Sequence, residues 1–442
     1  MGWVGGRYAS LVAQTNRPVV VMCGVSAIIG LGFGLVGPIL PLYAETFRTS
    51  LTMVGLLVGA LSLARLVSNL PGGYLADIVG YRRVLILSSL VIGGGALGSG
   101  LTTDFRQLFA FQILLGIGAG FFHTTGFALM ARLSNTWNRV RMLTAYQGCF
   151  MLAAIFGPTI GGIAAQMWGY RVPFLGFALL AGLASALIYW GVFQAGDRSE
   201  RTPVPVAEGR DLERAAGSRS AVGPQEIRDQ GWRVGGVFRL LSEPAFLLVT
   251  FWGFCTWFAR RGLQGTVVPL LGATRLGLSE GEIGFAYTLM GIMSLLAMLL
   301  VSGSISVRYG RKAAIVPSTL VMAIALMLFA CSREYSVFLL SAGLLGAGSG
   351  AIGPVPIAYV SDMVPSASYG SSLGLYRSLR DLGAFLGAVA AGWIMDRAEV
   401  AVPLYLGAVV LILGATCFGA FASDTRRVAV PPALPIGPSD MQ

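Results

Sequence analysis

The 442-residue sequence predicts an all-α membrane protein, with twelve transmembrane helices in two pseudo-symmetric six-helix halves. Three observations predict this fold class. Hydrophobic residues make up 55% of the chain and charged residues only 12%, whereas soluble domains are usually about 25% charged. Apolar stretches long enough to cross a bilayer recur along the chain. The second half also repeats residues of the first half at a constant offset.

The apolar stretches are each about 20 residues long, which is the length that crosses a hydrocarbon core ~30 Å thick. They begin near Val19, Leu51, Val84, Gln107, Met142, Val172, Ala245, Ile283, Ala313, Val337, Ser372 and Val402. The first stretch follows Arg17 and lacks a small-residue cleavage pattern. We therefore expect it to remain as span 1 rather than to be removed as a signal peptide.

The repeat joins positions that share one constant separation along the chain, and most of the matched residues are glycines. Matched pairs include Gly73 with Gly303, Gly80 with Gly310, Arg82 with Lys312, Gly157 with Gly387 and Gly162 with Gly392. Such a repeat without gaps indicates two six-span halves in the same orientation. The expected division is an N-terminal half at residues 1–193, a linker at 194–243, a C-terminal half at 244–423 and a tail at 424–442.

The linker and the tail are expected in the cytoplasm, together with both termini. Most of the 31 lysine and arginine residues fall in alternate loops, and the positive-inside rule assigns those loops to the cytoplasm. The linker is rich in proline, glycine and charge and is predicted to be irregular, with a short surface helix near 232–241. The net charge of +11 suits the lipid surface and does not indicate a nucleic acid partner.

Residue usage also indicates the cellular location of the protein and the kinds of chemical site that it lacks. Thirty arginines beside one lysine are typical of a GC-rich bacterial genome, so we expect a multi-pass protein of the bacterial inner (plasma) membrane. The five cysteines are odd in number and form no CxxC pair, so we expect no disulfide framework, metal site or cofactor. HExxH and Walker patterns are absent from the sequence, which gives no support for a zinc enzyme of that type or for ATP-driven transport.

A charged, glycine-rich loop joins predicted spans 2 and 3. Its pattern GxxxDxxGYRR is formed by Gly73, Asp77, Gly80, Tyr81, Arg82 and Arg83. A weaker copy, GxxxVxxGRK, joins spans 8 and 9 and ends in Gly310, Arg311 and Lys312. Glycines permit a tight turn and close helix approach. Arginines suit the anionic inner surface, and Asp77 can accept hydrogen bonds from the start of a neighbouring helix.

This loop resembles the GxxxDxxGRR/K signature of the major facilitator superfamily of secondary transporters, and the resemblance extends over residues 17–423. Two more segments resemble its twelve-span drug:proton antiporters. They are LGFGLVGPILPLYAE at 31–45, and AxxxGPxxGG at Ala153, Gly157, Pro158, Gly161 and Gly162. The resemblance implies a span 5 bend at the interface between the halves. It also implies that the loop motif holds the cytoplasmic side shut in the outward-facing state.

Two departures from the family pattern affect these expectations. Gln112 stands where the antiporters commonly carry an arginine implicated in proton movement, so the resemblance implies the fold more directly than proton coupling. In the second loop Val307 replaces the aspartate, while Asp362 stands at the position equivalent to Arg132. We therefore expect Asp362 to hold Arg311 or Lys312, and Asp77 to cap the start of span 11.

Ionisable residues inside predicted spans indicate function by default, because they must line a cavity or form a pair. They are Arg65, His123, Arg260, Arg261, Arg377, Arg380 and Asp381. Asp381 and His123 are the candidates for proton coupling, although His123 is equally consistent with a packing role. Arg65 and Asp381 share a depth, about 18 and about 16 Å from the inner ends of their spans. Two pairs stay open: a gating Arg65–Asp381 bridge across the halves, and Arg377–Asp381 within span 11.

The candidate substrate-binding residues are His123, Gln147, Arg260, Arg261, Gln264 and Arg377. The excess of positive charge among the residues inside the spans favours an anionic or zwitterionic substrate. The sequence therefore predicts a monomeric secondary transporter that exports a small organic solute or drug by alternating access, in exchange for protons. The alternative is uptake, proton-linked or not, of a metabolite or organic anion.

Overall fold

The computed structural model describes residues 17–134, 139–191, 243–302, 310–352, 355–356, 359–360 and 369–422. The helices of the first half are α2 (Arg17–Val36), α3 (Ile39–Glu45), α4 (Leu51–Val79), α5 (Tyr81–Leu101), α6 (Phe105–Leu133), α7 (Arg139–Trp168) and α8 (Arg171–Gly191). Those of the second half are α12 (Pro244–Trp257), η1 (Phe258–Leu263), α13 (Gln264–Arg275), α14 (Glu280–Ala297), η2 (Met298–Ser302), α16 (Arg311–Cys331), α17 (Tyr335–Ile352), α19 (Tyr369–Met395) and α20 (Val402–Phe421). The elements η1 and η2 are π-helical turns.

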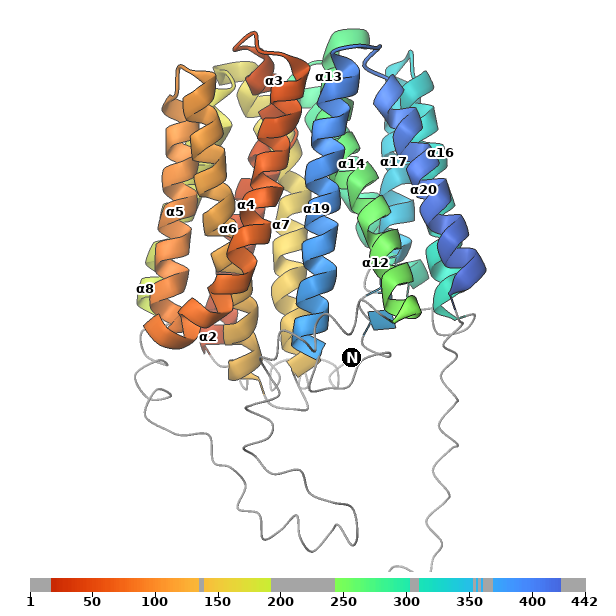
Figure 1. Cartoon of the computed structure of the whole chain (residues 1–442). Helices are drawn as coiled ribbons and strands as arrows, with labels where there is room; N and C mark the ends of the chain where they lie inside the picture. The colour runs from red at the N-terminus through yellow and green to blue at the C-terminus, as the bar shows by residue number, and fades with distance from the viewer. Residues whose placement is uncertain are drawn as a thin grey trace, which may run out of the picture.

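Within these described residues the helices form twelve membrane-crossing runs (Figure 1). Ten runs are long and apolar enough to span a bilayer by length and composition alone, with α2 and α3 together forming the first. The other two are α12–η1–α13 and α19, which carry the arginines and the aspartate expected inside spans 7 and 11. The twelve-span fold expected from the sequence is therefore confirmed.

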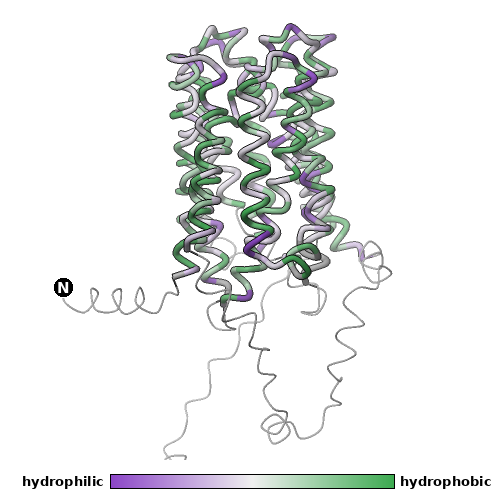
Figure 2. The backbone as a smooth tube through the Cα atoms, turned by 90° about the vertical axis from the view of Figure 1, so that its left-hand side faces the viewer, coloured by the Kyte–Doolittle hydropathy of each residue, from purple (hydrophilic) through white to green (hydrophobic). Residues whose placement is uncertain are grey.

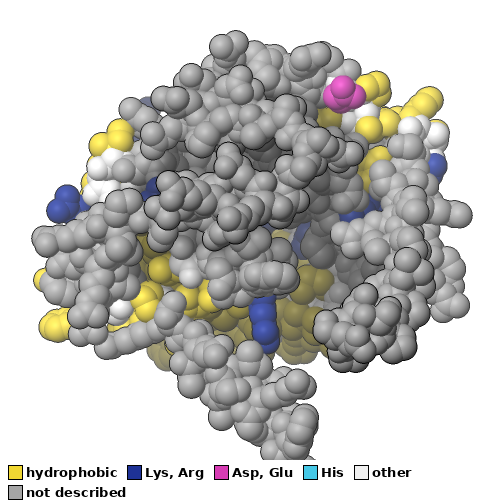
Figure 3. Space-filling view, turned by 90° about the horizontal axis from the view of Figure 1, so that it is seen from below, with side chains coloured by type: hydrophobic (Ala, Val, Ile, Leu, Met, Phe, Trp, Pro, Cys, Tyr) yellow, Lys and Arg dark blue, Asp and Glu magenta, His cyan; other side chains and the backbone are white. Residues whose placement is uncertain are grey.

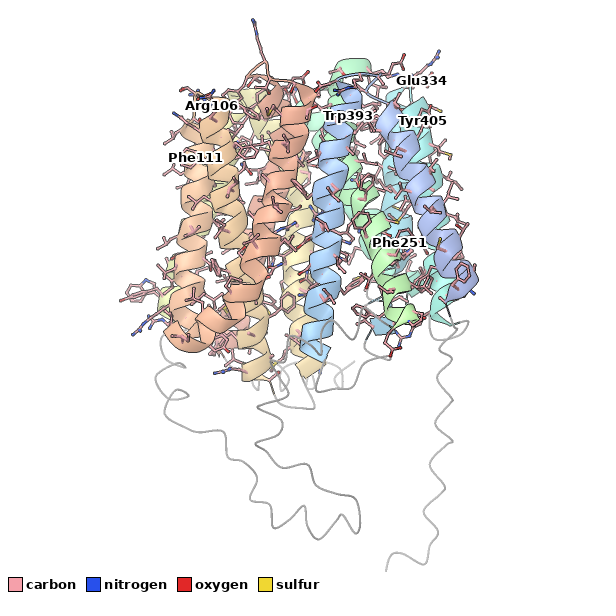
Figure 4. All side chains as sticks on the ribbon, in the orientation of Figure 1. Arg106, Phe111, Phe251, Glu334, Trp393 and Tyr405 are labelled. Carbon is pink, nitrogen blue, oxygen red and sulfur yellow. The ribbon has the colours of Figure 1, made fainter. Side chains whose placement is uncertain are left out.

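The outer surface of the bundle is apolar, as a membrane requires. Figure 2 shows hydrophobic segments along the length of the helices. Large apolar side chains such as Leu179 and Val67 are exposed on this surface. Aromatic residues lie near both ends, with exposed Trp393 and Tyr405 toward the upper end in Figure 4 and Trp190 at the end of α8. Such belts of Trp and Tyr are typical of the membrane–water interface.

The two halves meet along two pairs of helices. Helix α4 packs against α19, and α7 packs against α14. In Figure 1, α4 and α19 run side by side through the centre of the bundle. Helices α7 and α19 begin at Arg139 and Tyr369, which are separated by the offset of the repeat, so the two contacts are related by it. Mid-depth side chains on the facing sides of these four helices therefore lie between the halves.

Candidate functional site

An ion pair joins the halves at mid-depth. Arg65 lies 14 residues from either end of α4, which is about 21 Å at 1.5 Å per residue. Its Nη2 atom is 4.0 Å from Oδ1 of Asp381 on α19, and the Asn69 side-chain amide donates to Asp381 Oδ2 at 3.5 Å. The side chains of Arg65 and Asp381 are only 17% and 11% exposed. Of the two pairs that the sequence left open, Arg65–Asp381 is the contact seen here.

The other arginines of α19 lie over aromatic rings. The Arg377 guanidinium is 5.1 Å from the centroid of Phe127 on α6, so this contact also crosses between the halves. The Arg380 guanidinium lies 3.9 Å from the centroid of Trp257 on α12 and 5.4 Å from that of Tyr376. Aromatic faces attract cations electrostatically, and the attraction strengthens where water is excluded.

Arg260 and Arg261 lie in the π-helical turn η1 of the seventh run. Single π turns inside α-helices are frequent at functional sites. Arg261 is exposed although it lies 14 residues, or about 21 Å, from the end of α13. The turn packs against α19, and the charges of Arg65, Arg380 and Asp381 act on Arg261, so Arg261 lies near the Arg65–Asp381 pair. The mid-depth site therefore includes an accessible guanidinium.

His123 and Gln147 were also expected at the site. The half-buried His123 ring packs edge-on against Phe150, with centroids 4.9 Å apart, and stacks 6.4 Å from Phe33. The charges of Arg65, Arg261 and Arg377 reach His123. Gln147 is half-buried on α7. Their substrate and proton roles stay predictions.

Gln264 packs within the second half. Its side chain is 5% exposed and donates to Met290 Sδ at 3.1 Å. The π turn that precedes Gln264 adds a residue to the helix, which rotates later side chains by about 100° relative to an uninterrupted α-helix. A substrate role for Gln264 stays a prediction.

The glycine motif of span 5 lies where three helices meet. A Cβ atom at Gly157 would be 2.5 Å from Gly34 Cα, and one at Gly161 would be 2.1 Å from Leu35 O, both on α2. A Cβ at Gly162 would instead be 2.2 Å from Glu280 O on α14, in the other half. Pro158 lies inside α7, and its carbonyl oxygen approaches Gly284 of α14. The motif thus reaches the interface between the halves, and the bend that the resemblance implied there stays a prediction.

A glycine with positive φ ends the turn in each of the two loop motifs, as far as the described residues show. Gly80 has φ 98° and Gly310 has φ 91°, values that L side chains rarely adopt. Arg82 donates to Tyr189 O at 3.2 Å, Arg311 to Val355 O at 3.4 Å and Lys312 to Ala422 O at 3.5 Å. Gly73 lies within α4, and Arg83 is exposed at the start of α5.

The expected acidic partners of these loops were Asp77 and Asp362. The side chain of Asp77 and the whole of Asp362 lie outside the described residues. Gating by this end of the protein therefore stays a prediction. Figure 3, seen from this end, shows basic and hydrophobic side chains among atoms that are not described.

At the opposite end, uppermost in Figure 1, described polar contacts join the halves. Asp396, just beyond α19, accepts hydrogen bonds from Leu51 N at 2.7 Å, from Thr52 N at 2.9 Å and from Thr52 Oγ1. Tyr170 donates to Glu280 Oε1 at 2.5 Å. We call these five residues the upper gate. It is closed in this structure.

The upper gate was missed by sequence reasoning, although the repeat carries a signal for it. Asp396 and Gln166 are related by the offset of the repeat, and each follows a glycine of the repeat, Gly392 or Gly162, by four residues. Gln166 Oε1 lies 2.7 Å from where a Cβ of Gly281 would be, at the start of α14. A polar side chain at the end of α7 therefore lies at the start of α14, and one just beyond α19 lies at the start of α4.

Removing the Asp396 side chain should weaken the upper gate. Loss of a cap at a helix start costs about 1 kcal/mol, so Asp396→Ala should shift the closed-to-open ratio about fivefold. The measurement is the distance between spin labels at Arg106 and Glu334, which Figure 4 shows at the upper end of the two halves. Glu399→Ala, an exposed acid three residues further along the same loop, is the control. An unchanged distance distribution in Asp396→Ala would contradict this role.

The Asp396 contact should also depend on pH. Burial raises the pKa of the carboxyl, but hydrogen bonds from Thr52 and Leu51 and the charge of Arg397 outweigh it and lower the pKa overall. A lowered pKa means that the contact is at full strength above the ordinary aspartate pKa of about 4. It is lost as the pH falls through the lowered value. The distance distribution should therefore be constant near neutral pH and broaden only in acid.

Comparison with known proteins agrees with this architecture. The family model of the Major Facilitator Superfamily matches residues 22–263 and 250–434. An uncharacterized MFS-type transporter of Methanocaldococcus jannaschii is 21% identical over 373 residues, covering 84% of this chain and 89% of the relative. Quinolone resistance protein NorA of Staphylococcus aureus is 22% identical over 399 residues, covering 90% of this chain and 95% of NorA.

Solved structures share the fold at low identity. A D-xylose–proton symporter superposes with a TM-score of 0.72 at 17% identity, over 92% of this chain and 99% of the symporter. A POT family transporter in complex with 5-aminolevulinic acid gives 0.74 at 14% identity, over 92% and 96%. The twelve runs, the repeat and the family match along both halves lead to one conclusion. The chain belongs to the Major Facilitator Superfamily.

Proposed function

We propose that this secondary transporter exports a small organic solute in exchange for protons. The single observation that carries the proposal is the Arg65–Asp381 pair, which joins α4 of one half to α19 of the other at mid-depth. Alternating access moves the two halves relative to each other around a site at this level. A titratable pair between the halves therefore couples protonation to the movement.

The coupling follows from the chemistry of the pair. A protonated Asp381 carboxyl cannot form an ion pair with Arg65, so closing this contact requires the proton to leave. Removing one partner of a buried ion pair costs about 3–5 kcal/mol. That is enough to shift a two-state equilibrium by more than a hundredfold. In exchange, the proton enters Asp381 from outside when the upper gate is open and leaves toward the cytoplasm when the gate closes.

Export requires that the closed upper gate face the outside. Arg82, Arg83, Arg311 and Lys312 are at the opposite end, and the positive-inside rule assigns that end to the cytoplasm. The conformation described here then loads its solute from the cytoplasm. The similarity to NorA, a quinolone resistance protein, supports the proposal of export. The similarity in fold to a D-xylose–proton symporter is consistent with the proposed use of protons.

Neutralising Asp381 should uncouple the transporter. In liposomes with a pH-sensitive dye trapped inside, solutes added to the wild type should drive proton flux, and Asp381→Asn should reduce that flux at least about a hundredfold. The direction of the flux distinguishes antiport from symport. Arg106→Gln, an exposed change at the upper end, serves as the control. Solute movement that ignores the proton gradient in the wild type would contradict the proposal and favour facilitated diffusion.

A further inference from the structure

The mid-depth site holds a large excess of positive charge. The residues that form it are Arg65, Arg260, Arg261, Arg377, Arg380 and Asp381. Five guanidinium groups and one carboxylate leave a formal excess of four positive charges. Arginine keeps its proton in proteins, so the site cannot discharge itself by releasing protons from these groups. A charged group inside the membrane is energetically costly unless a group of opposite charge lies beside it.

Some of these guanidinium groups are already accommodated by the protein. Arg65 pairs with Asp381, and Arg377 and Arg380 lie over the rings of Phe127 and Trp257. Asp381 is occupied in turn, because Arg65 and Asn69 both contact it. Arg65–Asp381 is the one ion pair between residues that the structure describes. The protein therefore supplies no second carboxylate at this level within the described part.

Arg261 is the group that this arrangement leaves accessible. It is exposed, its guanidinium lies 5.7 Å from the centroid of Trp257, and its turn η1 packs against α19, which carries Asp381. Its charge also reaches His123, which packs among the half-buried rings of Phe33 and Phe150. A guanidinium beside partly exposed aromatic rings offers two parallel N–H donors for a carboxylate and flat apolar surface for a ring.

We propose that the transported solute is an organic anion, with a carboxylate bound by Arg261 and an apolar, aromatic body held against Trp257, Phe33 and Phe150. The proposal rests on the transport function above and names the substrate class of the same site. A cationic solute is disfavoured by the same charges, because it would add to an excess of four and find Asp381 already paired. The solute itself supplies the negative charge that the site lacks.

The test compares the binding of three ligands that share one ring system and are anionic, neutral or cationic. Purified protein is titrated with 2-naphthoate, neutral 2-naphthamide and cationic 2-naphthylmethylamine, and binding is followed by thermal shift. Benzoate, benzamide and benzylamine form a second, smaller set. We expect the carboxylate of at least one set to bind about tenfold or more tightly than its amide, and the amine to bind weakest.

Arg261→Gln should reduce carboxylate binding about tenfold or more and leave amide binding within about twofold. Arg261→Lys should keep part of the preference, since it keeps the charge but loses the two-pronged geometry. Arg106→Gln is the matched control at an exposed site. Tighter binding of the amines, a preference that survives Arg261→Gln, or no saturable carboxylate binding would each overturn the proposal.

Binding and coupling can fail separately in these assays. The thermal-shift titration uses no membrane gradient, so a carboxylate preference that depends on Arg261 stands even if proton flux is absent. In Asp381→Asn, coupling should be lost while carboxylate binding persists or strengthens, because the site becomes more positive. Proton-coupled transport of amines with no carboxylate binding would support the transport mechanism and refute the substrate class.

Discussion

Exchanging the charges of Arg65 and Asp381 should restore much of the transport that each single reversal removes. Arg65→Asp alone leaves two carboxylates facing each other, and Asp381→Arg alone leaves no carboxylate beside the five guanidinium groups already there. Each single change should lower solute-driven proton flux at least about a hundredfold, because an uncompensated buried charge costs about 3–5 kcal/mol. The double variant recreates the pair across the same 4.0 Å contact, and should recover to within about tenfold of the wild type.

The matched control exchanges the other pair that the sequence allowed. Arg377→Asp combined with Asp381→Arg would restore a pair within α19, four residues apart, without joining the halves. We expect no recovery from it, because the Arg377 guanidinium contacts Phe127 and Arg65 would lose its carboxylate. Recovery in this control and not in the Arg65–Asp381 exchange would contradict the bridge. Gel filtration of each variant separates misfolding from loss of function.

The spans were predictable because a bilayer imposes a simple rule on sequence. Each predicted start lies within three residues of the helix that the structure describes, including Leu51 for α4 and Val402 for α20. Spans 7 and 11 were predictable despite their charges, although composition alone does not rank them as spans. The division at residues 193–194 and 243–244 stays a prediction, because the linker and the helix near 232–241 lie outside the described residues.

The Arg65–Asp381 contact was predictable from depth because each residue adds the same rise along a helix. The sequence alone did not decide between Arg65 and Arg377 as the partner of Asp381. Both are the right distance away, one across the halves and one along the helix. That choice depends on tertiary packing, since Phe127 offers Arg377 an aromatic face. Asn69, which also contacts Asp381, carries no charge and was not singled out.

The upper gate was not predictable in the same way. Asp396 is an exposed loop acid, and its partners are the backbone N–H groups of Leu51 and Thr52 and the Thr52 hydroxyl, about 345 positions earlier in the chain. Backbone donors leave no pattern of residue types in the sequence, and the repeat relates Asp396 to Gln166 without indicating the partners of either. The π turn η1 was also invisible, because no residue type specifies it. Both features depend on how α4, α19 and the seventh run pack together.

Valine at Gly162 or Gly392 should hold the upper gate open. These glycines are related by the repeat, and each lies against the first residue of a helix in the other half. A Cβ atom at either would be 2.2 Å from a backbone oxygen, of Glu280 or of Leu51. Backbone cannot rotate away as a side chain can, so the halves must separate. Overpacking of this kind costs about 1–3 kcal/mol per site, which is about a 5- to 150-fold shift toward the open form.

The readout for the valine variants is the distance between spin labels at Arg106 and Glu334, in a background without the five natural cysteines. Each single variant should lengthen this distance in a fraction of molecules, and the double variant in most of them. Gly182→Val on α8 is the control, because nothing lies within 4 Å of its Cβ position. Transport should fall in step with the closed fraction, since alternating access needs both states. If Gly162→Val and Gly392→Val transport normally and keep the short distance, the two contacts do not limit closure. The gate would then depend on Asp396 and Glu280 alone.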